Sequence, residues 1–170
     1  KLHKRGVLVG RGRWTLPTAD EGRVEPRPVV DRESREYLKA LKQCQEEVGT
    51  LRWLAMKTRP DIDACVSIAA TMQTHEPEVA LKMLQQIWRY LAATLEEVMV
   101  IIPDPEKEYL EIATDASFAP RGERSRTGVV LSLHGVALQW ASRKQDLTAS
   151  SAAEAEMEAT KVGLMLGLTI

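Results

Sequence analysis

Two carboxylate positions in this sequence could do chemistry, and the first is Asp115. It lies in an apolar stretch, residues 112–117 (IATDAS), whose pattern is typical of a β-strand. Asp is uncommon within strands, so its place there has two interpretations. Either Asp115 caps the turn that follows, or it is a metal-binding carboxylate carried on a rigid element.

The second carboxylate belongs to a helix predicted from about Ala149. Glu154 and Glu158 are one turn apart and Lys161 follows at an ion-pair spacing, so these three are expected on the solvent face. Glu156 points the other way. Its face is made of small residues, namely Ala152, Ala153, Ala159, Thr160, Gly163 and Gly167. Such a face lets a helix approach a sheet closely, and a buried Glu there would need a partner or a metal ion.

The elements that must position these carboxylates form two blocks. Helical periodicity predicts a helix over residues 33–48, which Gly49 can interrupt, and further helices from Pro60 and Pro77. Trp53 and Trp88 are expected to fill the core of this helical block. From residue 98 the period becomes strand-like. Strands are predicted at 98–102, 109–114, 127–133 and 136–141, and a short connection between the last two predicts a hairpin.

Composition limits the possible functions. The chain has 170 residues, of which 44% are hydrophobic and 28% charged, and this excludes wholesale disorder. No apolar run approaches the ~20 residues of a membrane span, so no membrane partner is expected. The two cysteines form no metal or redox motif, which is typical of an intracellular protein.

Charge is unevenly spread along the chain. The net charge of −1 by itself predicts no nucleic-acid partner, but residues 1–30 hold seven Lys and Arg against three acids. The extended basic arm, assigned to residues 1–32, is either a solvated tail or a contact to a nucleic-acid backbone. The chain starts at Lys1 and stops at Ile170 within an apolar run, so we expect a fragment of a longer polypeptide.

Six short blocks follow one another in a specific order. They are residues 48–62 (VGTLRWLA and TRPDI), 87–91 (IWRYL), 114–119 (TDASFA), 126–130 (RTGVV), 140–145 (WASRKQ) and 151–157 (SAAEAEM). This series resembles the C-terminal part of a copia-type LTR-retrotransposon polyprotein, whose segments read VGSLxYLAxxTRPDI, LRYL, SDADWA, STSGYV, WSSKKQ and SSTEAEY.

The resemblance implies an α/β (α+β) fold in two parts. Residues 33–97 would be the helical, thumb- or connection-like end of a reverse transcriptase. Residues 98–170 would be the N-terminal half of a ribonuclease H-like domain, with antiparallel strands and then a helix. That nuclease cleaves the RNA strand of an RNA–DNA hybrid with two divalent metal ions, usually Mg²⁺. By motif, Asp115 and Glu156 would be its catalytic and metal-binding acids.

The resemblance also implies partners: an RNA–DNA hybrid or other nucleic acid, and the remainder of the polyprotein, in the cytoplasm or the nucleus. The residues expected to contact nucleic acid are Ser117, Arg121, Arg124, Arg126, Arg143 and Lys144. Ordinary surface charge is the alternative for the basic residues among them.

Two departures from the family pattern leave other functions open. Ser117 and Phe118 stand where the family has Asp and Trp, and the family's later aspartates have no counterpart before Ile170. We therefore expect weak Mg²⁺ binding and low activity from the chain alone. One alternative is a catalytically dead transposon relic that acts as a nucleic-acid-binding or scaffold module. Another is an unrelated helical interaction protein whose acids are surface residues.

Overall fold

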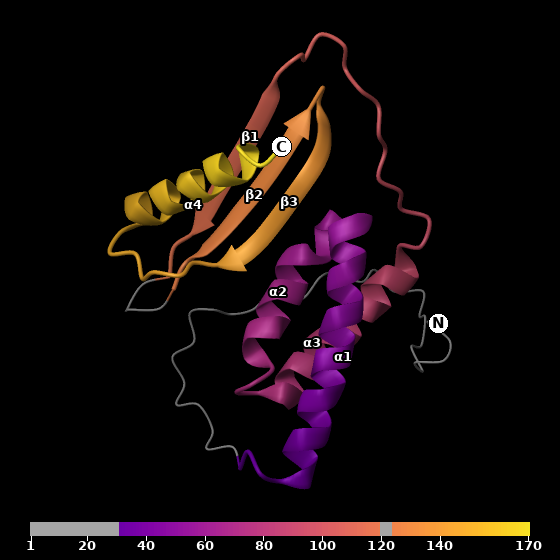
Figure 1. Ribbon diagram of the computed structural model, residues 1–170. Helices are drawn as coiled ribbons and strands as arrows, with labels where there is room; N and C mark the ends of the chain where they lie inside the picture. The colour runs from indigo at the N-terminus through magenta and orange to yellow at the C-terminus, as the bar shows by residue number, and fades with distance from the viewer. Residues whose placement is uncertain (1–30, 120–123) are drawn as a thin grey trace. The chain divides into compact units, whose positions relative to one another are not determined.

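The computed structural model describes residues 31–119 and 124–170 (Figure 1). Contacts divide the chain into two compact units, Lys1–Val98 and Met99–Ile170. The described part of the first is helical, and the second contains a three-stranded antiparallel sheet and a helix, so the class is α+β. The expected basic arm lies outside the described residues except for its last two positions, and Arg121 lies outside them as well.

The first unit is built from helices whose starts are encoded locally. Its elements are α1 (Arg35–Lys57), the 3₁₀ turn η2 (Pro60–Ile62), α2 (Asp63–Met72) and α3 (Pro77–Ala93). Ser34 Oγ accepts a hydrogen bond from the amide of Tyr37 at 3.2 Å and caps α1. Pro60 and Pro77 open η2 and α3, as predicted, because their missing N–H is not needed in a first turn.

Helix α1 runs without a break through Gly49, so the interruption considered there does not occur. Val48 and Leu51, on either side of Gly49, are both buried in the core of the unit. Packing of this face against α2 and α3 therefore outweighs the low helix propensity of one glycine.

The helical core confirms one of the two tryptophan predictions. Trp88 is 8% exposed and belongs to the core, whereas Trp53 is 65% exposed, so the prediction for Trp53 is wrong. Trp53 follows the fully buried Leu51 by two residues. At about 100° per residue, this spacing carries its side chain to the far side of α1.

The second unit contains β1 (Leu110–Ser117), β2 (Arg126–Leu133) and β3 (Val136–Lys144) in the order β1-β2-β3. The predicted hairpin between β2 and β3 is confirmed. His134 and Gly135 form its two-residue turn with φ values of 51° and 73°, and such turns fit the twist of the flanking strands. The strand predicted at 98–102 does not form. Its β-branched side chains are exposed, and composition alone does not make a strand without a paired neighbour.

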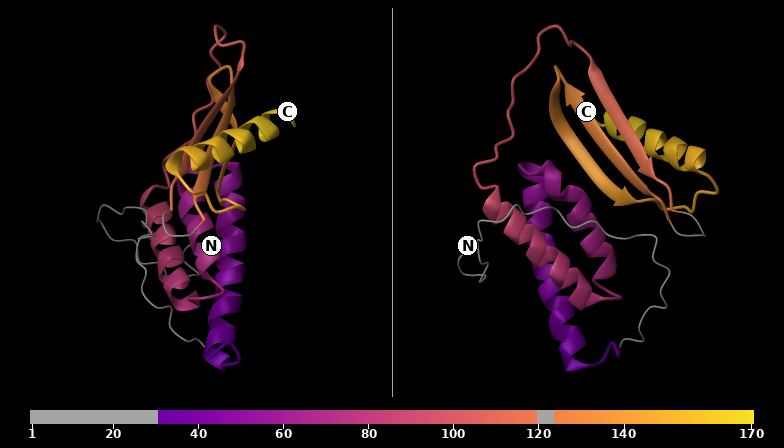
Figure 2. Two further views of the ribbon diagram at one scale, coloured as in Figure 1. Left: turned by 90° about the vertical axis from the view of Figure 1, so that its left-hand side faces the viewer. Right: turned by 180° about the vertical axis from the view of Figure 1, so that it is seen from behind.

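Helix α4 (Ala152–Gly167) lies along one face of the sheet, against β1 and β2 (Figure 2). Val129, Leu131 and Val162 form the core of this unit, with Ile112 and Leu166 packed against them. The other face of the sheet carries no helix within the described part of this unit. Among the described residues, no helix has both the length and the apolar character needed to cross a membrane.

Candidate functional site

Strand β1 places Asp115 on the face of the sheet away from α4. Side chains alternate along a strand, and Ile112 and Thr114 lie under α4, where they would collide with a Cβ added at Gly163. Asp115 therefore projects from the opposite face, and it is exposed. It is paired with Gly128 of β2, whose missing side chain leaves the neighbouring position open.

The alternative role of Asp115 as a turn cap finds no support in its contacts. Asp115 lies within β1, two residues before the strand ends at Ser117. Within residues 31–119 and 124–170, its carboxylate accepts no hydrogen bond from a backbone amide of the following turn. The carboxylate is thus presented by the strand itself.

Helix α4 accounts for two of its three glutamates by local contacts. Ser151 caps the helix, its Oγ accepting from the amide of Glu154 at 3.2 Å, and Glu154 in turn accepts from Ser150. Hydrogen bonds from Ser150 lower the pKa of the exposed Glu154 carboxyl. Glu158 pairs with Lys161 at 3.2 Å, as the spacing predicted. These local contacts account for Glu154 and Glu158, but they do not involve Glu156, which lies between them in the sequence.

Glu156 lies on the other side of α4 from Glu154 and Glu158, as periodicity predicted, but it is exposed at the flank beside β1 and is not buried against the sheet. Glu158, predicted on the solvent face, is partly buried. Glu156 Oε1 accepts a hydrogen bond from the amide of Ala116 at 3.3 Å. That nitrogen is two covalent bonds from the Cα of Asp115, so Glu156 Oε1 lies within about 6 Å of that Cα. Strand β1 is an edge of the sheet within the described residues. The carboxylate of Glu156 therefore reaches the backbone beside Asp115 at an open strand.

Two glycines allow α4 to approach β1 this closely. A Cβ at Gly163 would lie 2.5 Å from Thr114 Cγ2 and 2.9 Å from Ile112 Cγ2, and one at Gly167 would lie 2.6 Å from Ile112 Cδ1. These distances are shorter than side chains tolerate. Thr160, one turn after Glu156, continues the contact, since its Oγ1 lies 3.4 Å from Thr114 Oγ1. Small residues are therefore needed at these positions of α4, because larger side chains would collide with β1.

Gln145 is a positioning residue that sequence reasoning did not single out. It is buried, and its Nε2 donates to Thr127 Oγ1 at 3.0 Å and to Ala155 O at 2.8 Å. The first contact is to β2 and the second to the first turn of α4, one residue before Glu156. Its place as the last residue of the block WASRKQ, one of the blocks that resemble the family, could have drawn attention to it.

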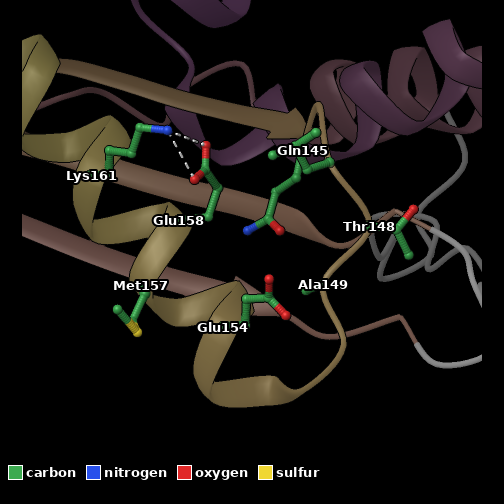
Figure 3. A pocket seen from close by; sticks show the side chains of 8 residues that line it. Gln145, Thr148, Ala149, Glu154, Met157, Glu158 and Lys161 are labelled. Atoms are coloured by element: carbon green, nitrogen blue, oxygen red, sulfur yellow. Dashed lines mark hydrogen bonds and ion pairs between the residues drawn. The ribbon is translucent and has the colours of Figure 1, made fainter.

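A shallow cavity of about 310 Å³ is lined by α4 and by the loop before it (Figure 3). Gln145 and Leu147 line it from the loop before the helix, and Glu158, Lys161 and Met157 line it from α4. Neither Asp115 nor Glu156 contributes to this cavity. Glu156 reaches the backbone of β1 at its open edge, whereas the Asp115 side chain projects from the face of the sheet away from α4.

The strand register brings part of the expected nucleic-acid contacts together. Ser117 pairs with Arg126, and Arg126 with Lys144, so these three form a row across the end of the sheet. The row shares a face with Asp115, two residues from Ser117. Arg126 is only 8% exposed, whereas Ser117 is exposed and Lys144 partly so.

The other two described arginines lie near this row. Arg143 pairs with Thr127, which contacts Gln145 beneath α4, so Arg143 lies on the opposite face of the sheet. Arg124 precedes β2, and both arginines are exposed. The structure therefore places expected contacts on both faces at one end of the sheet.

The block TRPDI of the helical unit has a structural role. The Arg59 guanidinium donates to both carboxylate oxygens of Asp61, at 3.0 and 2.7 Å, and to the carbonyl of Thr94 at 3.1 Å. Tyr90 OH also donates to Asp61, at 2.9 Å, and its ring lies under the guanidinium. These contacts tie the segment before α2 to the end of α3. Asp61 is thereby engaged and is no candidate for catalysis.

Electrostatics agree with this role. Burial would raise the pKa of Asp61, but hydrogen bonds from Arg59 and Tyr90 outweigh it and hold that pKa below its ordinary value. The hydrogen bond to Asp61 raises the pKa of Arg59, and burial together with the bond to Asp61 raises that of Tyr90. Arg59, Asp61 and Tyr90 thus form a charge-assisted hydrogen-bond cluster that stabilises the packing of the helical unit.

Comparison with protein-family models, with curated proteins and with solved structures found no match for this chain.

Proposed function

We propose that the chain is part of a copia-type LTR-retrotransposon polyprotein and joins the end of a reverse transcriptase to the start of a ribonuclease H-like domain. The complete domain would cleave the RNA strand of an RNA–DNA hybrid inside the cell. One observation carries the proposal: Glu156 of α4 accepts a hydrogen bond from the residue that follows Asp115 on β1. The side chain of Glu156 thereby reaches the backbone next to Asp115, although 41 positions separate the two acids in the sequence.

The donor set at this edge fits a hard cation. Two exposed carboxylates supply oxygen ligands, and Mg²⁺ binds proteins through one or two carboxylates while keeping several waters. Within residues 31–119 and 124–170, no group of three or more His, Cys, Asp or Glu side chains could hold a metal ion. These residues could therefore supply at most two protein ligands to a weakly bound Mg²⁺ ion. Further acids would have to complete the site.

Each residue has a stated role in this proposal. Asp115 and Glu156 would hold Mg²⁺, with the Ala116 amide fixing one oxygen of Glu156. When bound, Mg²⁺ supplies water activation and stabilisation of the leaving oxygen. Ser117 and Lys144, on the face of Asp115, would contact one part of the hybrid backbone. Arg143 would contact another from the opposite face.

Binding to a short RNA–DNA hybrid tests this arrangement in the chain as it stands. Affinity should fall steeply with rising salt, because phosphate contacts release counterions. Arg143→Ala and Lys144→Ala should each weaken binding and reduce the salt slope by about one unit. Lys82→Ala, an exposed lysine of the helical unit, is the matched control and should change neither. Absence of any affinity for the hybrid contradicts the proposed contacts.

Cleavage itself is tested in a longer version that includes the further acids of the family pattern. Cutting of the RNA strand should require Mg²⁺ and should be lost in both Asp115→Asn and Glu156→Gln. Normal cutting by both variants would overturn the assignment of these acids.

A non-catalytic nucleic-acid-binding or scaffold module is the second candidate. Its support is that Asp115 and Glu156 are both exposed and that no group of three or more potential metal ligands forms within the described residues. This candidate predicts hybrid affinity that is unchanged by Mg²⁺ and by Asp115→Asn. The catalytic proposal predicts tighter binding with Mg²⁺, and no such gain in Asp115→Asn.

A further inference from the structure

Helix α1 carries a second regular face, turned away from the core of its unit. Counting from Leu38, alternate steps of four and three residues reach Lys42, Gln45, Gly49, Arg52 and Met56, and all six positions are exposed. The step is the 3.5-residue repeat by which one helix packs lengthwise on another. We call this set, with the adjacent Trp53, the α1 stripe. It spans about 27 Å along the helix.

The α1 stripe is apolar and basic. Leu38, Trp53 and Met56 are each more than half exposed, an unusual concentration of large apolar side chains on one face of a helix. The charged members, Lys42 and Arg52, are both positive. Among the acids of α1, Glu36 and Glu47 lie on the opposite side of the helix. Glu46 is one heptad before Trp53 and one turn after Lys42, at the border of the α1 stripe.

Gly49, near the middle of the α1 stripe, is not required sterically by the described residues around it. A Cβ added there would meet nothing within 4 Å, so the fold offers room for a larger side chain. Glycine in the middle of a helix lowers helix stability compared with alanine. Gly163 and Gly167 of α4 illustrate one use of a helical glycine in this chain, since both allow β1 to approach the helix closely.

We propose that the α1 stripe is the docking surface for an acidic amphipathic helix of a partner protein. Leu38 and Met56 would anchor its apolar side at the two ends, with Trp53 beside them. Lys42 and Arg52 would pair with its carboxylates, and Gly49 would let the two backbones approach where the helices cross.

Two other occupants fit the α1 stripe less well. A nucleic acid would use Lys42, Arg52 and the ring of Trp53, but it gives no reason for Leu38 and Met56 at the ends or for Gly49 between them. A second copy of the same surface would bring basic stripes together. An acidic helix satisfies the apolar, basic and glycine positions together.

Calorimetric titration of the full chain with a synthetic helical peptide tests the proposal. The peptide has Leu at the two core positions of each heptad and Glu at most others, and its matched control has Lys in place of Glu. The acidic peptide should bind and the basic one should not. Arg52→Glu should weaken binding about tenfold or more, whereas Lys82→Glu, at an exposed lysine of α3, should have little effect.

A Gly49→Leu variant separates docking from folding. Because the position has open space and leucine favours helices, its thermal midpoint should stay the same or rise, while peptide affinity falls about tenfold. Unchanged affinity in Gly49→Leu, or equal binding of the basic peptide, overturns the proposal. A third contrary result would be that the acidic peptide does not bind, while single-stranded DNA does bind and Trp53→Ala abolishes that binding. Self-association through the α1 stripe in sedimentation equilibrium also overturns the proposal.

Discussion

The amide of Ala116 donates a hydrogen bond to Oε1 of Glu156 across 3.3 Å, and this contact joins β1 to α4 beside Asp115. It gives Glu156 a structural role, and the proposed metal-binding role would use the same carboxylate. A carboxamide can accept the same hydrogen bond but is a poor ligand for a hard cation. The two roles can therefore be separated by substitution.

Glu156→Gln is expected to abolish metal binding at the β1 edge without unfolding the unit. Since Gln retains an acceptor for the Ala116 amide, its free energy of unfolding should change by no more than about 0.5 kcal/mol. With Mn²⁺ as the probe, NMR signals of residues around Asp115 should broaden in the original chain and stay sharp in this variant.

Glu158→Gln is the control for that measurement. Glu158 lies on the same helix but pairs with Lys161, so its loss should leave the broadening around Asp115 intact. Broadening that is centred on Glu154 and Glu158, or that survives Glu156→Gln, would show that the β1 edge is not the metal site.

Gly163→Ala is expected to destabilise the sheet unit by up to about 2 kcal/mol. The added methyl would collide with Thr114 and Ile112, and overpacking of this kind costs about 1–3 kcal/mol, from which about 1 kcal/mol of helix propensity is recovered. Hydrogen exchange of β2 amides in increasing urea reports this unit by itself. Gly167→Ala should have a smaller effect because its close contact is with Ile112 Cδ1, a terminal methyl that can rotate away. Equal effects of the two substitutions would contradict this steric account.

Gln145→Leu is expected to loosen the start of α4. It removes the hydrogen bonds to Thr127 and Ala155, each worth about 1 kcal/mol, and leaves a buried hydroxyl with one partner fewer. Amide exchange in the first turn of α4 should accelerate, and Mn²⁺ binding should weaken because Glu156 follows Ala155 directly. A loss of stability with unchanged Mn²⁺ affinity would limit Gln145 to a purely structural role.

The helical unit is expected to lose stability in acid through Asp61. The pKa of this carboxyl in the folded chain is below its ordinary value of 3.8, so its stabilising contribution is present above that value and is lost as pH falls through the lowered pKa. Thermal unfolding of the helices, followed by circular dichroism between about pH 5 and about pH 2, should show this decline.

Asp61→Asn should flatten that pH dependence, because the variant has no titrating group at this position. Its stability near neutral pH should be lower, since Arg59 loses a charged partner. The matched control is Glu78→Gln in the first turn of α3, which should leave the acid decline in place. An equally steep decline in Asp61→Asn would assign it to other carboxyls.

Local sequence signals predicted most of the elements of this chain and the direction of its key side chain. The prolines at residues 60 and 77 predicted the starts of η2 and α3, and the connection at His134 predicted the hairpin. Periodicity placed Glu154 and Glu158 on one side of α4 and Glu156 on the other. These are properties of neighbouring residues, and such properties depend on the backbone geometry of single turns and strands.

Long-range packing decided the rest. The helical pattern could not show that α1 continues through Gly49 or that Trp53 turns outward, because both depend on which face of α1 meets α2 and α3. Residues 98–102 have strand-forming side chains but no strand beside them. The bond from Ala116 to Glu156 and the burial of Gln145 exist only when α4 lies on β1 and β2. The sequence by itself determined which side chains could form a site, and tertiary structure decided which of them meet, since contacts across tens of residues arise only from packing of whole elements.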